Sequence, residues 1–351
     1  MSRPSLAEMF RRQGEHCLPG SPLYHHLLLR AAADLEAGGV VAEVMAGHED
    51  DPAGSVPTLR LMGAVHRLVL QRQAPELATY FPSVGGTAAP DRAWPAFARL
   101  LAAETAAIRE LTGRPVQTND VGRSAPLLGA LLVIADRTRL PVRLLEVGAS
   151  AGLNLRVEHF GYALGGKALG DPSSEVVLTD PWVGRPPAPL DTPLRIVERR
   201  GCDPAPIDPR TTEGRLTLTS YVWADWIERL ERLRAALHVA ARVPATVDRA
   251  YADEWLAARL AAPVPGTVTV VWHSVVWQYV DLAERERARR IVLAAAARAD
   301  AKAPLAHLAL EPRRQPDGGW RFELWLTSWP GPGLGVRLAH SPGHGVPVTW
   351  H

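Results

Sequence analysis

The chain of 351 residues is 47% hydrophobic and carries 39 Lys and Arg residues against 37 Asp and Glu residues, a formal net charge of +2. This length and composition predict a folded protein with a large core, in two domains or in one domain with an extension. Because opposite charges are interspersed, the sequence offers no patch for nucleic acid or for a membrane surface. We therefore expect neither nucleic acid nor a membrane as a binding partner.

The cysteine content and the N-terminal sequence favour the cytoplasm. Cys17 and Cys202 form no CxxC pair, which argues against a disulfide framework and a zinc site, and the histidines near Cys17 have no standard metal-site spacing. The N-terminus lacks a signal-peptide core, and the longest apolar run, Ala125–Ala135, is too short to span a bilayer. We expect a cytoplasmic protein without a metal ion.

The first third of the chain shows helical periodicity with end signals. Helices are predicted over about Ser21–Glu36, where Ser-Pro begins the helix, and over Thr58–Arg72 and Trp94–Leu111. The last of these ends at the glycine and proline of Gly113–Pro115. The pattern predicts a helical cap domain over residues 1–114.

The rest of the chain, residues 115–351, alternates strand and helix signals, which predicts an α/β domain. A Gly- and Pro-rich stretch at about 157–195 suggests an inserted hairpin or loop. The expected sheet is mostly parallel, with helices on both faces and a C-terminal antiparallel hairpin. Strands are expected at Arg143–Val147, Arg195–Arg199, Thr267–Trp272, Leu305–Leu310 and Arg321–Thr327. Helices are expected to start at Ser124, leading to the strand at Arg143, and to span about Ser220–Ala240 and Leu282–Arg298.

The most informative segment is RLLEVGASAGLNLR, Arg143–Arg156. It reads as a buried strand, a turn containing Gly148 and Gly152, and a helix beginning near Gly152. Glycine permits positive φ and close approach of a ligand, and a helix start directs free N–H groups into the same space. This pattern predicts a nucleotide-like cofactor at the carboxyl edge of a parallel sheet.

Three strand ends share this character: Glu146–Gly152, Gly201–Pro204 and Val271–Ser274. Together they resemble a class I S-adenosylmethionine-dependent methyltransferase over roughly Arg143 to Glu311. The N-terminal helices and the QTNDVGRSA segment, Gln117–Ala125, also resemble an uncharacterised bacterial family of unknown function that carries this Rossmann-like fold.

The methyltransferase resemblance implies S-adenosylmethionine as cofactor and assigns its contacts. Glu146, Gly148 and Gly152 match the element that holds the methionine half, with Ser150 where the middle glycine is usual. Asp203 matches the acid that binds the ribose, and Asp253 the acid that contacts the adenine. The separation of 57 residues between Glu146 and Asp203 (203 − 146 = 57) implies an insertion, and Asp171 is the alternative ribose ligand.

Three further residues complete the candidate site. His273 follows a strand and is the candidate catalytic base for an acceptor hydroxyl, although a hydrogen-bonded core histidine has the same signature. Asn119 and Arg123 are candidates for holding the cofactor carboxylate, with a solvated helix cap as the alternative. Glu146 and Asp253 also have structural interpretations, as an ion-paired residue and as a helix cap.

Two other functions compete with a methyltransferase acting on an unidentified small molecule. Residues 148–152 also match G-x-S-x-G, the nucleophile turn of α/β-hydrolases, with Ser150 as nucleophile. Its partners would be Asp248 or Asp253 and His273 or His307. The third interpretation is a non-catalytic protein that keeps the fold to bind the cofactor or a partner.

Overall fold

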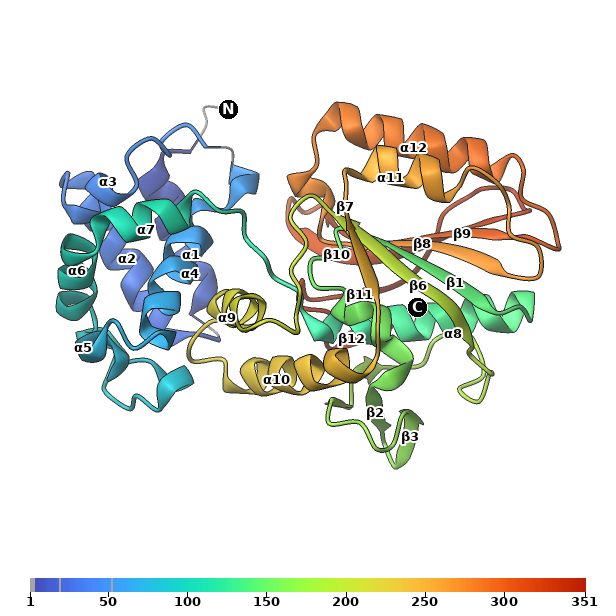
Figure 1. Ribbon diagram of the computed structural model, residues 1–351, viewed down its shortest axis with the longest axis horizontal. Helices are drawn as coiled ribbons and strands as arrows, with labels where there is room; N and C mark the ends of the chain where they lie inside the picture. The colour runs from blue at the N-terminus through green and yellow to red at the C-terminus, as the bar shows by residue number, and fades with distance from the viewer. Residues whose placement is uncertain (1–3, 19, 52) are drawn as a thin grey trace. The chain divides into compact units, whose positions relative to one another are not determined.

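The computed structural model describes residues 4–18, 20–51 and 53–351. The chain divides into two compact units (Figure 1), and each is described by itself. One unit comprises Met1–Thr118 and Thr211–Leu233, and the other comprises Asn119–Arg210 and Arg234–His351. The first unit therefore includes a segment that the sequence analysis assigned to the α/β domain.

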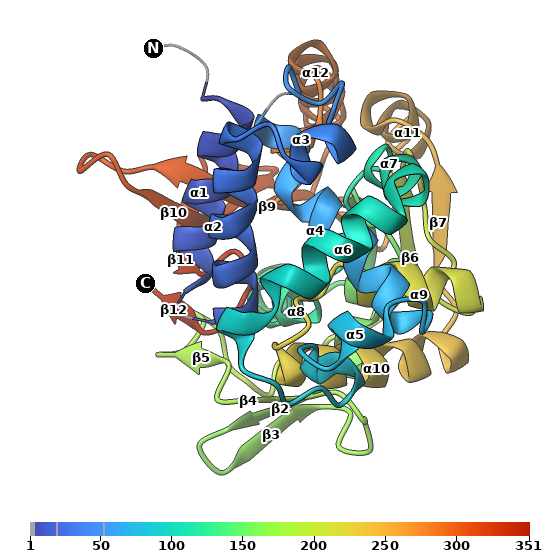
Figure 2. The same cartoon turned by 90° about the vertical axis from the view of Figure 1, so that its left-hand side faces the viewer.

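Every regular element in the described residues of the first unit is helical. Ser21 begins the second helix by accepting a hydrogen bond from Tyr24 N–H at 3.2 Å, as its sequence predicts. Helices α1 and α2 pack side by side (Figure 2), and Phe10, Leu27 and Phe97 belong to the buried core. The helices are α1 (Leu6–Cys17), α2 (Pro22–Glu36), α3 (Val40–Val44), α4 (Pro57–Leu70), α5 (Pro75–Ala78), α6 (Trp94–Ala103), α7 (Thr105–Thr112) and α9 (Thr212–Ser220), with 3-10 turns η1 (Ala53–Ser55), η2 (Pro82–Val84) and η3 (Pro90–Arg92).

The second unit is a mixed α/β structure built on a large sheet. In the described residues the sheet has nine strands in the order β5-β12-β11-β10-β9-β8-β1-β6-β7. Strands β7, β6, β1, β8 and β9 run parallel to one another. The pairs β9–β10, β10–β11 and β11–β12 are antiparallel, and β12 pairs with β5 in parallel. The strands are β1 (Val142–Val147), β5 (Trp182–Val183), β6 (Ile196–Asp203), β7 (Thr246–Arg249), β8 (Val268–Ser274), β9 (Leu305–Arg314), β10 (Trp320–Trp329), β11 (Val336–Ser341) and β12 (Val348–Trp350).

Helices cover both faces of this sheet. Helices α11 (Ala252–Arg259) and α12 (Leu282–Ala296) lie on one face, and α8 (Ser124–Thr138) lies on the other (Figure 1). Val271, Leu256 and Val292 are buried together between the sheet and α11 and α12. The remaining helical elements are α10 (Ile227–Arg242), which crosses the division between the units, and the 3-10 helices η4 (Val121–Arg123), η5 (Leu153–His159) and η6 (Trp277–Tyr279).

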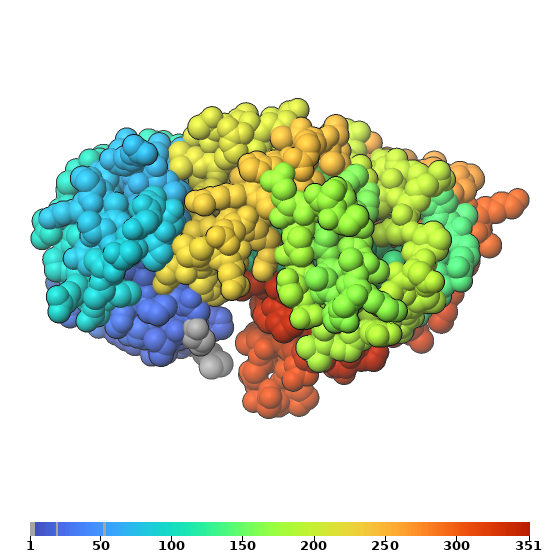
Figure 3. Space-filling model, turned by 90° about the horizontal axis from the view of Figure 1, so that it is seen from below, coloured from blue at the N-terminus to red at the C-terminus, as the bar shows by residue number. Residues whose placement is uncertain are grey.

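The insertion expected at about 157–195 forms a small sheet of its own. Strands β2 (Gly161–Leu164) and β3 (Lys167–Gly170) make an antiparallel hairpin, and β4 (Val177–Thr179) pairs with β2 in parallel. The chain then reaches β5, which pairs with β12 in the large sheet. Figure 3 shows the green insertion beside the red C-terminal strands.

Two predicted helices have different bounds in the structure. The helix expected over Trp94–Leu111 stops at Glu104 (φ −115°, ψ 25°), where the Thr105 hydroxyl donates to the Leu101 carbonyl at 2.7 Å. Such a bond to the preceding turn competes with the helix backbone. The helix expected over Ser220–Ala240 begins only at Ile227, as α10, because α9 ends at Ser220 and the segment between them is not helical. In this segment Asp225 accepts hydrogen bonds from Ser21 and Leu23 at the start of α2.

Candidate functional site

The order of the parallel strands defines where a ligand is expected. Numbered along the chain, the strands β7-β6-β1-β8-β9 run 3-2-1-4-5 across the sheet. The order reverses beside β1, and open α/β sheets bind ligands outside the carboxyl ends of the strands at such a reversal. The turn Gly148–Gly152 follows β1 directly at this point.

Three residues of the turn have positive φ: Gly148 (69°), Ser150 (53°) and Gly152 (64°). A Cβ on Gly148 would lie 2.2 Å from Val276 Cγ2, and one on Gly152 would lie 2.9 Å from Val247 Cγ2. The two glycines are therefore required by the protein's own side chains, whether or not a cofactor approaches the turn.

The helix expected after Gly152 is instead the 3-10 helix η5, in which Arg156 leaves helical geometry (φ −106°, ψ 23°). The first N–H of this helix, on Leu153, donates to Asn119 Oδ1 at 2.8 Å. Asn119 thus caps the helix, and the structure does not place an α-helix N-terminus at the turn. A helix therefore begins where the sequence predicts it, but it is a 3-10 helix and its first N–H is not free. The Arg156 guanidinium donates back to the Gly152 carbonyl at 2.6 Å.

Asp203 holds the turn in place from the end of β6. Its Oδ2 accepts the Ser150 N–H at 3.0 Å and its Oδ1 accepts the Ala205 N–H at 2.9 Å. Each carboxylate oxygen has two lone pairs, so both can accept a further hydrogen bond. The alternative ribose ligand, Asp171, lies in the insertion and accepts both the N–H and the hydroxyl of Ser173.

Glu146 is buried near the end of β1, and its Oε2 accepts no hydrogen bond from any described residue. Burial raises the pKa of Glu146 to about 8, against the opposing influence of the nearby Trp272 indole and of two guanidinium groups. The Trp272 Nε1–H itself donates to no acceptor in the described part of the chain. Glu146 is therefore mostly protonated at pH 7.

Arg123 and Asp253 have structural partners in the second unit. Arg123 donates to the carbonyls of Gly343 (3.0 Å) and Ser274 (3.2 Å), which fastens the end of β8. Asp253, in the first turn of α11, accepts a hydrogen bond from Arg287 Nε at 2.5 Å. Although burial alone raises the pKa of Asp253, this guanidinium bond lowers it below its usual value.

The predicted site residues of β1 and β8 belong to opposite faces of the sheet. In the parallel register Val147 is level with His273 and Glu146 is level with Trp272. Since side chains alternate along a strand, His273 lies on the face covered by α11 and α12, and Glu146 on the other face. The structure thus divides the predicted site into the turn with Glu146 and a separate histidine cluster.

His273 is the centre of a chain of hydrogen bonds that the sequence did not reveal. Its Nδ1 lies 2.7 Å from Glu311 Oε1, and its Nε2 lies 3.0 Å from His307 Nε2. The Trp277 ring lies beside it, with 4.4 Å between the ring centroids. Burial, and then the neighbouring His273, lower the pKa of His307 to about 3, so that this ring is neutral.

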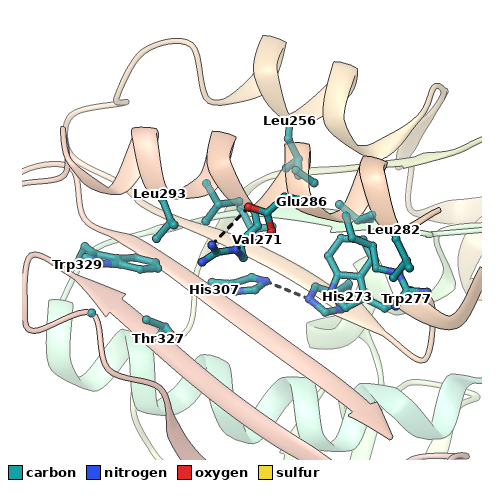
Figure 4. A pocket seen from close by; sticks show the side chains of 16 residues that line it. Leu256, Val271, His273, Trp277, Leu282, Glu286, Leu293, His307, Thr327 and Trp329 are labelled. Atoms are coloured by element: carbon teal, nitrogen blue, oxygen red, sulfur yellow. Dashed lines mark hydrogen bonds and ion pairs between the residues drawn. The ribbon is translucent and has the colours of Figure 1, made fainter. Parts of the chain in front are cut away.

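Three members of this cluster, His273, His307 and Trp277, line a cavity of about 420 Å³ beneath α12 (Figure 4). Most of its walls are apolar, and its volume lies within the range of small-molecule sites. Glu311 and the cavity had no local sequence signal, because β9 comes into register with β8 only through pairing across more than thirty residues. The apolar and aromatic walls include Leu256, Val271, Trp277, Leu282, Leu293 and Trp329.

Two of the residues suggested as hydrolase partners of Ser150, Asp248 and His273, are engaged elsewhere. Asp248 accepts two hydrogen bonds from Arg200 at 2.7 Å each and a third from the Trp255 indole. Both ring nitrogens of His273 face Glu311 and His307. The positive φ of Ser150 matches the strained turn of a hydrolase, but a triad needs a histidine nitrogen directed at the serine.

A protein-family model described as "Uncharacterized protein conserved in bacteria (DUF2332)" matches residues 7–350. No curated protein and no solved structure matches the sequence. None of the helices in the described residues has the length and apolar character needed to cross a membrane. Across residues 4–18, 20–51 and 53–351, His, Cys, Asp and Glu side chains form no group of three or more suited to a metal ion.

Proposed function

The chain belongs to this uncharacterised bacterial family, and because that membership names no reaction, we propose from the site itself that it is an S-adenosylmethionine-dependent methyltransferase acting on a small molecule. The observation that carries the proposal is the glycine turn after β1, at the point where the order of the parallel strands reverses. This is the position that a nucleotide-like cofactor takes in open α/β sheets.

The side chains around the turn are compatible with this cofactor. Glu146 has a buried carboxyl oxygen without a partner in the described residues, as a group that awaits a polar ligand would have. Asp203 keeps a spare lone pair on each oxygen beside the turn, where it would accept ribose hydroxyls. Glu146 and Asp203 are therefore the residues assigned to hold the cofactor.

The protein would contribute mainly by positioning. When bound, S-adenosylmethionine supplies an activated methyl group on a sulfonium, so that little acid–base chemistry is required of the side chains. Arg123 fixes the end of β8 against the loop that contains Gly343, and Asp203 fixes the turn, which keeps the edge of the sheet rigid. His273 is not the free base expected from the sequence, because both of its nitrogens have partners.

One observation favours a second candidate, a non-catalytic protein that binds the cofactor or a related nucleoside. Asn119 and Asp203, both assigned to the cofactor from the sequence, are used by the chain to build the turn. Binding of S-adenosylmethionine without transfer of its methyl group to any acceptor would support this candidate.

Calorimetric titration of the full chain with S-adenosylmethionine and S-adenosylhomocysteine tests the proposal. We expect a dissociation constant in the micromolar range, about −8 kcal/mol. In Asp203→Ala the affinity should weaken by about 1–3 kcal/mol, because charge-assisted bonds are lost. Asp171→Ala is the matched control and should leave the affinity unchanged. No heat and no thermal shift with either compound would reject the proposal.

A further inference from the structure

The cavity beneath α12 combines an apolar interior with a histidine, His307, whose Nδ1 forms no hydrogen bond with any described residue. We propose that it binds a small planar apolar molecule with a single O–H or N–H group, of the phenol or indole class, and that His307 Nδ1 accepts the hydrogen bond. This inference does not rest on the methyltransferase proposal, because none of the residues 148–152 lines the cavity.

The hydrogen bonds of the two histidines limit which nitrogen is open. Glu311 Oε1 lies 2.7 Å from His273 Nδ1 and accepts its proton. The proposal assigns the proton between the two rings to His307, which donates its Nε2–H to His273 Nε2 across 3.0 Å. His307 Nδ1 is left with a lone pair and forms no hydrogen bond with any residue that the structure describes.

The shape and surface of the cavity select the rest of the ligand. Its volume of about 420 Å³ suits a molecule of one or two rings. Trp277 and Trp329 contribute flat aromatic surfaces and Leu293 an aliphatic one, as Figure 4 shows. Aromatic rings pack favourably by stacked or edge-to-face contacts, so a planar ligand gains most from these walls.

The charged residues at the cavity argue against a cationic ligand. Arg289 forms an ion pair with Glu286, with Nε and Oε2 at 3.2 Å. Arg285 donates its Nε–H to the Val280 carbonyl at 2.9 Å. These two guanidinium groups disfavour a cationic ligand, whereas a neutral donor such as phenol meets no unfavourable charge. His307 remains the acceptor that distinguishes one neutral ligand from another.

Ligand-observed NMR of the full chain with phenol and with anisole tests the assignment. Anisole has nearly the same shape but no O–H, so phenol should bind at least about tenfold more tightly. In His307→Phe this preference should disappear. His340→Phe, on β11 outside the cavity, is the matched control and should preserve the preference.

The proposal is overturned if phenol does not bind, if phenol and anisole bind the native chain equally, or if the preference survives in His307→Phe. A second variant keeps the test decisive should His307→Phe fail to fold. Leu293 lines the cavity and is 43% exposed, so Leu293→Trp should be tolerated and should weaken both ligands. Unchanged binding in Leu293→Trp would place the ligands elsewhere and reject the cavity as their site.

Discussion

The turn after β1 and the cavity beneath α12 lie in the same α/β unit, but their polar groups differ in how they are hydrogen-bonded. At the turn, Asp203 and Asn119 are used to satisfy backbone N–H groups, and the glycines make room for Val276 and Val247. At the cavity, a chain of side-chain hydrogen bonds ends on an acceptor with no partner in the described residues. The glycines of the turn are thus explained by the backbone conformation alone, whereas an acceptor without a partner in an apolar cavity favours a bound ligand.

The largest effect is expected from a substitution that adds one carbon atom to the turn. Gly148→Ala should lower the free energy of unfolding by about 2–5 kcal/mol, since left-handed strain of about 1–2 kcal/mol adds to overpacking against Val276 of about 1–3 kcal/mol. Urea unfolding measures the loss. Gly266→Ala is the matched control, because Gly266 also has positive φ (80°) but nothing within 4 Å of the added carbon. Equal losses in the two variants would show that Val276 does not restrict the turn.

A smaller effect should come from Glu146, whose pKa in the folded protein is raised to about 8 by burial from a usual value of 4.5. The stability that the protonated carboxyl contributes is fully present below the usual value and is lost as the pH rises through about 8. Glu146→Gln cannot ionise, so its stability relative to the native chain should increase between pH 5 and pH 9 by about 1.4 kcal/mol, the equivalent of one pKa unit, or more. Thermal unfolding at several pH values measures this, and a difference that stays constant with pH would contradict a buried protonated Glu146.

Local signals in the sequence predicted much of the fold. The Ser-Pro start of α2, the apolar run of β1 and the β-branched run of β8 are each formed where the pattern placed them. The alternation of strands and helices after residue 115 also predicted the largely parallel sheet, with helices on both faces. These elements follow from propensities and periodicity within a few neighbouring residues.

The remaining features depend on contacts between distant segments, which single residues do not signal. The non-helical segment between α9 and α10 contains Asp225, which bonds to the start of α2, about two hundred residues away in sequence. Glu311 joins His273 only because β9 pairs with β8. The separation of Glu146 from His273 follows from register, since two neighbouring positions on paired strands point to opposite faces.

The most direct test of the cofactor site is amide hydrogen exchange of the full chain with and without S-adenosylhomocysteine. The account predicts slower exchange at the N–H groups of Ser150 and Ala205, which are bonded to Asp203, and of Leu153, which is bonded to Asn119. Exchange around His307 in β9 should not change. Unaltered exchange throughout residues 148–153 at a saturating concentration of the compound would contradict a cofactor site at this turn.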